Sequence, residues 1–510
     1  MAEWPALLSR DLASTGAACA LADASGDLSR ADLESRVRLW AAVLGRRSLL
    51  PGDRILLLLP HGIDSWVALL AVLALGATAI PVSPELPAAD LRQIVRIWRP
   101  SACLAPDSVM AGGQEIGLPP ERMHGIETLP RKWPRNRPLG DVGREGLMRF
   151  AMRGQVLLAA GTLAGEAGYL HGIGSLLANA RRLIRALDLA PSLSGLLALP
   201  VTHWAGLVAG LGLLDAGRPV WLVDPDCSGL APEGCGPVAC FTTLADWRRR
   251  LARPGATGEG DSIRHLVATA GTLGRAMLGQ TRSRIGAVPF DLIHGTPLHL
   301  AATRLHVGPE PPPPGCIGYP LPGTEIRVMR QPMRETRPGQ AGYLVCSGDG
   351  GLPCQPGRDD PLRPAAGAPL DQGEIGWREA DGRLFRLPSP KDLIRTAGRV
   401  MAPEELEDQI LESGLVDDAF AFGVPHPVLE EAVVLVAVAR PRVTPHLLRE
   451  FCRRTLPDFM VPHRIELHAR LPVQSLARSG RQHLRLRYAG FYGEAATSCP
   501  GTDPRGPAGC

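Results

Sequence analysis

Lysine is almost missing from this chain of 510 residues. Of the 55 lysine and arginine residues, only Lys132 and Lys391 are lysines, so a mechanism that needs an ε-ammonium group has two candidates. The arginines are spread along the chain, and the formal net charge is +4. No nucleic-acid partner is therefore expected, because such partners require a concentrated basic surface.

Cysteine motifs are lacking as well. The chain has 11 cysteines, an odd number, and none forms a Cys-x-x-Cys pair. We expect neither a disulfide framework nor a metal site built from cysteines, and we predict a cytoplasmic location. Glu3 lies close to the start, and no charged-then-apolar pattern follows it, so no signal peptide is expected.

Long hydrophobic runs are also absent. The longest uncharged apolar run extends from Trp66 to Val82, which is short for a membrane-spanning helix, and His61 and Asp64 precede it. A core helix followed by a strand is the favoured interpretation, and no membrane span is expected.

The chain has the composition of a globular protein, with 45% hydrophobic and 21% charged residues. At 510 residues it is too long for one core, so at least two domains are expected. Apolar runs alternate with helical patterns in a first block. This block predicts a strand at 54–59, a helix at 63–75, a strand at 77–82, a helix at 88–98 and a strand at 101–105.

A second block repeats this alternation. It predicts a strand at 156–159, a helix at 175–187, a strand at 195–199, a helix at 205–214 and a strand at 219–223. Strand, helix and strand at this spacing indicate a parallel sheet with helices on its faces, so two doubly wound α/β subdomains are expected.

The character changes between residues 308 and 373, where proline and glycine rise and helical patterns vanish. Antiparallel strands are predicted there at 324–329 and 342–346. A last compact unit begins near Lys391. It is expected to contain a helix at 403–411, strands at 418–423 and 433–439, and a helix at 445–455.

Several of these stretches resemble one family in the right order, from about residue 30 to residue 488. They are Leu49 to Val82 with Pro51-Gly52-Asp53 and Leu75-Gly76-Ala77, Leu321 to Glu325, Gly373 to Gly376 with Asp381 to Leu384, and Lys391 to Arg395 with Gly398 and Pro403 to Glu407. The family is the AMP-binding, or adenylate-forming, superfamily, which includes acyl-CoA synthetases and adenylation domains.

The resemblance implies an α/β fold in two domains. Residues 1–390 would form a large N-terminal domain of two doubly wound α/β subdomains and a small distorted β-barrel. Residues 391–489 would form a small α+β lid. Residues 490–510, rich in Gly, Pro and Ser, are expected to be a disordered tail.

The resemblance also implies a reaction in two steps. A small-molecule carboxylate attacks the α-phosphate of ATP, with Mg²⁺ present, and gives an acyl-adenylate. After the lid rotates, the thiol of coenzyme A or of the pantetheine on an acyl carrier protein takes the acyl group.

A glycine-rich loop resembles the phosphate-binding loop of the family. Gly161, Thr162 and Gly168 are kept, and the resemblance assigns them to the phosphates of ATP. Ala167 stands where the family has lysine, and Glu166 adds a negative charge that repels a triphosphate. A weakened phosphate loop and a purely structural turn both remain open.

The adenine and ribose segments are partly kept. His294-Gly295 aligns with a segment that stacks on adenine, but Leu298 replaces its magnesium-binding glutamate and cannot ligate a hard cation. Glu374 replaces the ribose-binding aspartate and keeps its charge, while Ser389 replaces a second ribose contact, an arginine. His294 could stack or be structural, and Glu374 could bind ribose or be a surface carboxylate.

Three further residues complete the predicted site. His203 corresponds to a histidine beside the acyl pocket, or else it only begins a helix. Lys391 falls at the hinge of the lid, whose peptide would swing between two orientations. Arg481 occupies the position of the catalytic lysine, where it keeps the charge and can bind phosphate with two hydrogen bonds.

Three functions are compatible with this pattern. One is a working ligase, one is a non-catalytic relative that binds an acyl or nucleotide ligand or a partner protein, and one is an ATP-independent acyl transferase. Losing several phosphate, metal and ribose contacts together predicts weak or absent adenylation. The well-kept lid segment favours activity instead.

Overall fold

The structure of the protein is a computed structural model that divides into two compact units, Met1–Leu387 and Pro388–Cys510. The residues that it describes are 19–110, 116–131, 154–159, 168–224, 236–252, 262–269, 271, 273–330, 334–347, 352–354, 371–388, 392–469, 471, 481, 484–485 and 487–488.

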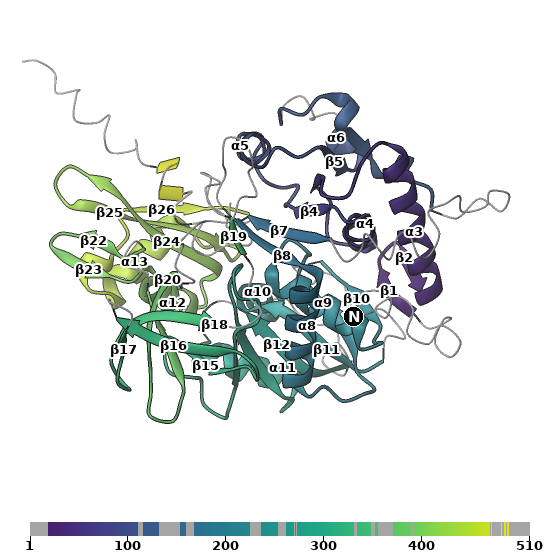
Figure 1. The fold of residues 1–510 in the computed structure, drawn as a ribbon. Helices are drawn as coiled ribbons and strands as arrows, with labels where there is room; N and C mark the ends of the chain where they lie inside the picture. The colour runs from purple at the N-terminus through teal and green to yellow at the C-terminus, as the bar shows by residue number, and fades with distance from the viewer. Residues whose placement is uncertain are drawn as a thin grey trace, which may run out of the picture. The chain divides into compact units, whose positions relative to one another are not determined.

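The N-terminal unit contains a sheet of seven strands in the order β19-β8-β7-β4-β3-β5-β6 (Figure 1). The strands are β3 (Arg54–Leu57), β4 (Thr78–Pro81), β5 (Ala102–Ala105), β6 (Met123–Gly125), β7 (Gln155–Ala159), β8 (Gly168–Gly172) and β19 (Leu352–Cys354). Helices α4 (Ile63–Ala74), α5 (Ala88–Trp98) and α6 (Asp107–Met110) belong to the same stretch of chain. Strands β7, β4, β3, β5 and β6 run parallel, which confirms a doubly wound arrangement.

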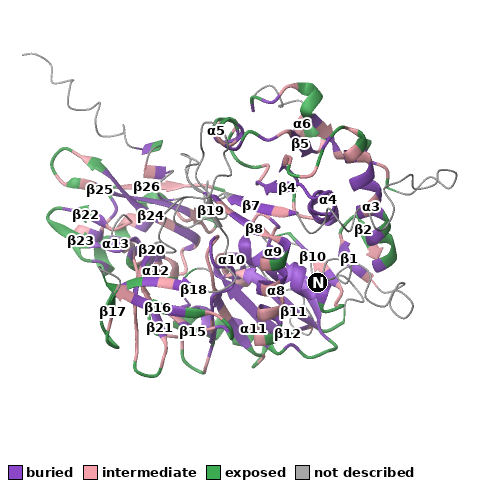
Figure 2. Cartoon of the chain, viewed as in Figure 1, coloured by how far each residue is buried: buried purple, intermediate pink, exposed green. Residues whose placement is uncertain are grey.

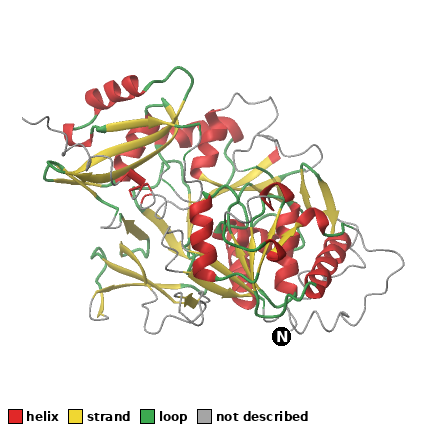
Figure 3. Ribbon diagram, turned by 90° about the horizontal axis from the view of Figure 1, so that it is seen from above, coloured by secondary structure: helices red, strands yellow, loops and turns green. Residues whose placement is uncertain are grey.

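A second sheet joins 14 strands in the order β17-β16-β18-β20-β21-β15-β14-β13-β12-β11-β9-β10-β1-β2. The parallel part comprises β1 (Cys19–Asp23), β9 (Ser194–Leu197), β10 (Val220–Leu222), β11 (Val238–Thr243), β12 (Ile263–Thr269) and β13 (Phe290–His294). Its helices are α3 (Arg30–Arg46), α8 (Ile173–Leu187), α9 (Trp204–Asp215), α10 (Leu244–Ala252) and α11 (Arg275–Ile285), and Figure 3 shows helices beside the strands of this unit. The remaining strands of the sheet pair antiparallel.

Most of those antiparallel strands come from the stretch that is rich in proline and glycine or from its flanks. They are β2 (Gly26–Ser29), β14 (Thr303–His306), β15 (Cys316–Pro320), β16 (Glu325–Arg330), β17 (Arg334–Glu335), β18 (Gly342–Ser347), β20 (Asp371–Arg378) and β21 (Leu384–Leu387). The predicted strands at 324–329 and 342–346 correspond to β16 and β18, and these two pair with each other.

One strand lies in a different sheet from the one that its sequence position suggests. The strand predicted at 156–159 was grouped with the second block, but β7 pairs with β4 of the first sheet, Thr78 opposite Gln155. This pairing joins residues that are 77 positions apart in the chain, and periodicity does not encode such a long-range pairing.

The longest apolar run of the sequence lies in the core of the N-terminal unit. Helix α4 and strand β4 are almost wholly buried, and helix α9 is buried along its whole length (Figure 2). A helix that is apolar on every side belongs in the centre of a large core. Within the described residues, no helix is both long and apolar enough to span a membrane.

The C-terminal unit is built on a sheet of five strands. They are β22 (Ile394–Thr396), β23 (Arg399–Met401), β24 (Val416–His426), β25 (Glu430–Ala439) and β26 (Arg464–Leu467). Helix α12 (Pro403–Glu412) begins with proline and two acidic residues, a favourable helix start. Helix α13 (Pro445–Thr455) is capped by Thr444, whose hydroxyl accepts a hydrogen bond from the N–H of Leu447.

Candidate nucleotide and acyl site

Strand β13 ends at His294, and a tight turn follows it. The N–H of Thr296 donates to the carbonyl of His299 at 2.9 Å, and the N–H of His299 donates to the Thr296 hydroxyl at 3.0 Å. Gly295 lies so close to its surroundings that a Cβ there would come within 2.6 Å of the Ala301 nitrogen and 2.8 Å of the Trp204 ring. Only a residue without a side chain fits this position, which holds the turn against the start of α9.

The structure brings together the residues predicted for adenine and ribose. His294 Nε2 lies 3.2 Å from Glu374 Oε2, although β13 and β20 are not neighbours in the sheet. On the other side of the carboxylate, Arg386 Nη1 lies 3.9 Å from Glu374 Oε1. Arg386 was not predicted from the sequence. It lies on β21 opposite Gly376 of β20, so it is a diagonal cross-strand neighbour of Glu374. The Glu374 side chain is thus turned toward His294 and Arg386, and the residue is 8% exposed.

Beside this pair is a small cavity of about 30 Å³. It is lined by His294, Thr296, His299, Glu374 and Cys346, together with apolar side chains. A cavity of this size holds a water molecule or two. A nucleoside is larger than this cavity, which His294 and Glu374 border.

No oxygen ligand stands at the position where the family resemblance places a magnesium-binding glutamate. Leu298 is 1% exposed and packs in the interior. Among the described residues, no group of three His, Cys, Asp or Glu side chains could hold a metal ion.

His203 begins helix α9. Its Nδ1 accepts a hydrogen bond from the N–H of Ala205 at 3.1 Å, so the side chain caps the helix. Burial lowers the pKa of His203 to about 4, which keeps the ring neutral. The next residue, Trp204, covers Gly295, and so the predicted acyl-pocket and adenine segments lie against each other.

The phosphate-loop residues are only partly within the described chain. Gly161, Thr162 and the neighbouring Glu166 and Ala167 lie outside it. Gly168 begins β8, where an added Cβ would come within 2.7 Å of the Trp98 ring. Close packing therefore accounts for this glycine, and its predicted contact with phosphate stays a prediction.

A histidine that the sequence did not single out ties β8 to the turn after β13. His171 is fully buried, and its Nε2–H donates to the carbonyl of Pro297 at 2.6 Å. Burial lowers the pKa of His171 to about 4. Its sequence position, inside an apolar strand pattern, gave no signal of a contact with residue 297.

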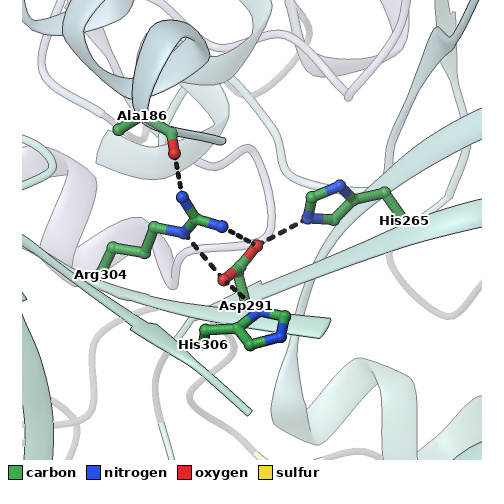
Figure 4. Close-up of polar contacts among 5 residues, drawn as sticks. All are labelled: Ala186, His265, Asp291, Arg304 and His306. Atoms are coloured by element: carbon green, nitrogen blue, oxygen red, sulfur yellow. Dashed lines mark hydrogen bonds and ion pairs between the residues drawn. The ribbon is translucent and has the colours of Figure 1, made fainter. Parts of the chain in front are cut away.

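A second unforeseen cluster surrounds Asp291, near the start of β13 (Figure 4). The guanidinium of Arg304 donates from Nε and Nη2 to the two carboxylate oxygens at 2.8 and 3.0 Å, and Arg304 also reaches the carbonyl of Ala186. His265 Nε2 and His306 Nδ1 lie 2.7 and 3.2 Å from the carboxylate. Although burial opposes it, these partners lower the pKa of Asp291. The cluster ties strands β12, β13 and β14 to the end of α8.

The lid residues lie in the C-terminal unit. Lys391 and Ser389 lie outside the described residues. Gly398 turns the hairpin between β22 and β23 with φ of 72°, a conformation that favours glycine. Arg481 is 4% exposed and is paired with Glu404 and Glu407 of α12. Its predicted contact with phosphate remains a prediction.

Two domains of known type match this chain. Residues 8–134 match the AMP-binding enzyme domain, and residues 405–480 match the AMP-binding enzyme C-terminal domain. The chain belongs to the adenylate-forming, or AMP-binding, superfamily.

Individual relatives agree with this assignment. The long-chain-fatty-acid–CoA ligase of Salmonella typhimurium is 33% identical over 175 residues, which cover 34% of this chain and 31% of that protein. The chain thus aligns with about a third of the length of such relatives. The sulfoacetate–CoA ligase of Cupriavidus necator is 25% identical and is covered almost throughout, over 92% of this chain and 93% of that one.

Solved structures show the same fold. The o-succinylbenzoate CoA synthetase of Bacillus subtilis, in complex with its acyl-adenylate, superposes with a TM-score of 0.72 at 18% identity. The superposition covers 95% of this chain and 98% of that one. It confirms the predicted fold class.

Proposed function

We propose that the protein is an acyl-CoA-synthetase-like member of the carboxylate-activating ligases whose ATP-driven adenylation is weak or absent. The observation that carries the proposal is the contact between His294 and Glu374 beside a cavity of about 30 Å³. The two side chains expected to hold the nucleoside hold each other instead.

The chemistry of the neighbouring positions supports the same proposal. Adenylation develops charge on the phosphates, and enzymes stabilise it with cations and metal ions. Leu298 offers no metal ligand, and Ala167 stands where the family has a lysine, beside the negative charge of Glu166. The cation and the metal ligand that would stabilise the phosphates are therefore both replaced, while Glu374 keeps the charge of the ribose-binding aspartate.

The substrate class follows from the relatives. They are named as ligases of long-chain fatty acids, oxalate and sulfoacetate with coenzyme A. We therefore infer a small-molecule carboxylate as the acyl substrate and coenzyme A or a carrier-bound pantetheine as the thiol, in the cytoplasm. The domain boundary near residue 390 and the hinge role of Lys391 belong to the same proposal.

ATP–pyrophosphate exchange with fatty, aryl and amino acids is the direct test. Exchange close to background with every acid is expected. Exchange well above background that is abolished by Glu374→Ala would show a working ligase and refute the proposal. Glu335→Ala, an exposed site on β17, serves as the control.

A non-catalytic relative is the second candidate, favoured by the closed geometry of the nucleoside segment. In that case the fold would serve to bind an acyl or nucleotide ligand or a partner protein in a biosynthetic pathway. Calorimetric titration with non-hydrolysable acyl-adenosine analogues separates the two. Heat of binding without exchange identifies a binding protein, whereas no heat with any analogue excludes a retained nucleoside pocket.

A further inference from the structure

The side chain of Arg481 closes a polar cluster between helix α12 and strand β24. Its Nη2 donates to both carboxylate oxygens of Glu407 at 2.8 Å, and its Nη1 donates to Glu404 at 2.7 Å. Its Nε donates to the carbonyl of Ala421 at 3.3 Å. The guanidinium carbon lies 4.7 Å from the centre of the Phe420 ring. Each nitrogen of the guanidinium therefore has a partner inside the C-terminal unit.

Glu407, the acidic partner, is also held within this cluster. It is 9% exposed, and besides Arg481 it accepts the N–H of Ala421 at 2.7 Å. Burial raises the pKa of Glu407 to about 7, although Arg481 opposes this shift. Although burial also opposes the charge of Arg481, Glu407 and Glu404 raise the pKa of this arginine. A buried charge pair with this many hydrogen bonds is satisfied as it stands, but either partner left alone would be a buried unpaired charge.

We propose that Arg481 is an internal latch that fastens α12 to β24 and is withheld from any phosphate. To reach a ligand, the guanidinium would have to leave Glu407, which would strand a carboxylate in the interior. The inference goes beyond the proposed function, because it concerns how the C-terminal unit is held together whether or not adenylation occurs.

The choice of arginine fits this role. A guanidinium presents donors in a planar fork that matches a carboxylate on one side and still reaches two further acceptors. A lysine ammonium has three donors on a single nitrogen and cannot join Glu407, Glu404 and Ala421 in this geometry. The family resemblance places a catalytic lysine at this position, but the chain has arginine here and only two lysines in all. The latch explains this arginine.

Differential scanning calorimetry of the full chain tests the latch. Arg481→Met is expected to lower the midpoint of the C-terminal transition by about 10 °C or more. Glu407→Leu should cause a similar loss. The double variant Arg481→Met/Glu407→Leu should recover more than half of either loss, because an apolar pair can replace a buried ion pair.

Two further variants sharpen the result. Arg481→Lys keeps the charge but not the fork, and it should also lower the midpoint without raising pyrophosphate exchange. Arg453→Met, at an exposed site on α13, should leave the midpoint within about 2 °C. If a single variant does not fold, recovery of folding in the double variant carries the same information.

Two outcomes would overturn the latch. One is an unchanged midpoint in Arg481→Met together with weaker binding of AMP or ATP, which would make Arg481 a ligand contact. The other is simple additivity in the double variant. Neither result depends on whether the wild-type chain catalyses exchange, so failure of the latch and failure of the proposed function can be told apart.

Discussion

His294 Nε2 lies 3.2 Å from Glu374 Oε2, and this contact joins two residues that are 80 positions apart in the chain. From the sequence, His294 was a candidate for stacking on adenine and Glu374 was a separate candidate for binding ribose. In the fold they form one unit, because β13 ends beside the face of β20 that carries Glu374. On the proposed function, a nucleoside that binds at these two residues competes with their contact.

Shortening the side chain of Glu374 should weaken its contact with His294 and so favour a bound nucleoside. Glu374→Asp withdraws the carboxylate by one methylene, so it no longer reaches His294, while the charge stays. Breaking a partly exposed contact of this kind costs about 1 kcal/mol, so we expect AMP to bind about fivefold more tightly to the variant. Isothermal titration calorimetry with AMP measures this change.

The control for this experiment is Glu335→Asp, which makes the same change at an exposed site. It should leave AMP affinity unchanged. Weaker AMP binding by Glu374→Asp would mean that the longer side chain itself contacts the ribose, and that its contact with His294 does not compete with the nucleoside.

A substitution at Gly168 tests whether this glycine is required for close packing or for binding phosphate. An alanine Cβ there would meet the Trp98 ring at 2.7 Å and Leu157 at 2.9 Å, so Gly168→Ala should lower the free energy of unfolding by about 2 kcal/mol. Gly308, which follows β14, has no atom within 4 Å of its added Cβ, and Gly308→Ala should change stability by less than about 0.5 kcal/mol. Urea denaturation followed by tryptophan fluorescence measures both. Equal stability of the two variants would contradict the packing role.

Much of the fold could be predicted because its elements carry local signals. Helices α5 and α13 begin and end at the predicted residues, since each has proline at or just before its start and a clear apolar stripe. Strands β4 and β9 are buried throughout, and a short continuous apolar run indicates such strands. What local signals could not supply is the partner of each strand, as the placement of β7 beside β4 shows.

The site was harder to predict for the same reason. Family resemblance located His294, Gly295 and Glu374 but gave no indication that two of them would touch. Arg386 and His171 went unnoticed, because their roles arise from a diagonal neighbour on another strand and from a turn 126 residues away. Such contacts depend on sheet register and burial, which exist only once the chain has folded.

The cluster at Asp291 should be among the most sensitive points of the N-terminal unit. Asp291→Asn keeps the shape of the side chain but removes its charge, which leaves Arg304 and the buried His265 without an anion. A loss of about 3–5 kcal/mol in the free energy of unfolding is expected. Asp381→Asn, which removes an exposed carboxylate paired with Arg383, should cost less than about 1 kcal/mol. Similar losses for the two variants would show that the buried network adds nothing.

His203 should make the fold sensitive to acid. The pKa of His203 is about 4 in the folded chain, below the usual 6.5. Between pH 6.5 and pH 4 the histidine is therefore protonated in the unfolded chain but neutral in the folded chain. The stability contributed by neutral His203, about 3 kcal/mol, is therefore complete above pH 6.5 and is lost as the pH falls toward 4. His171 adds a similar dependence.

Two variants of His203 test this dependence. The side chain of His203→Asn can still accept the N–H of Ala205, so this variant should lose stability less steeply as the pH falls. About half of the acid-induced loss that comes from His203 and His171 should be removed. His203→Ala should show the same flatter profile with a further loss of about 1 kcal/mol at every pH, because the helix cap is gone. Urea denaturation from pH 4.5 to 7.5 distinguishes these outcomes, and an unchanged pH profile in both variants would mean that His203 is protonated in the folded chain.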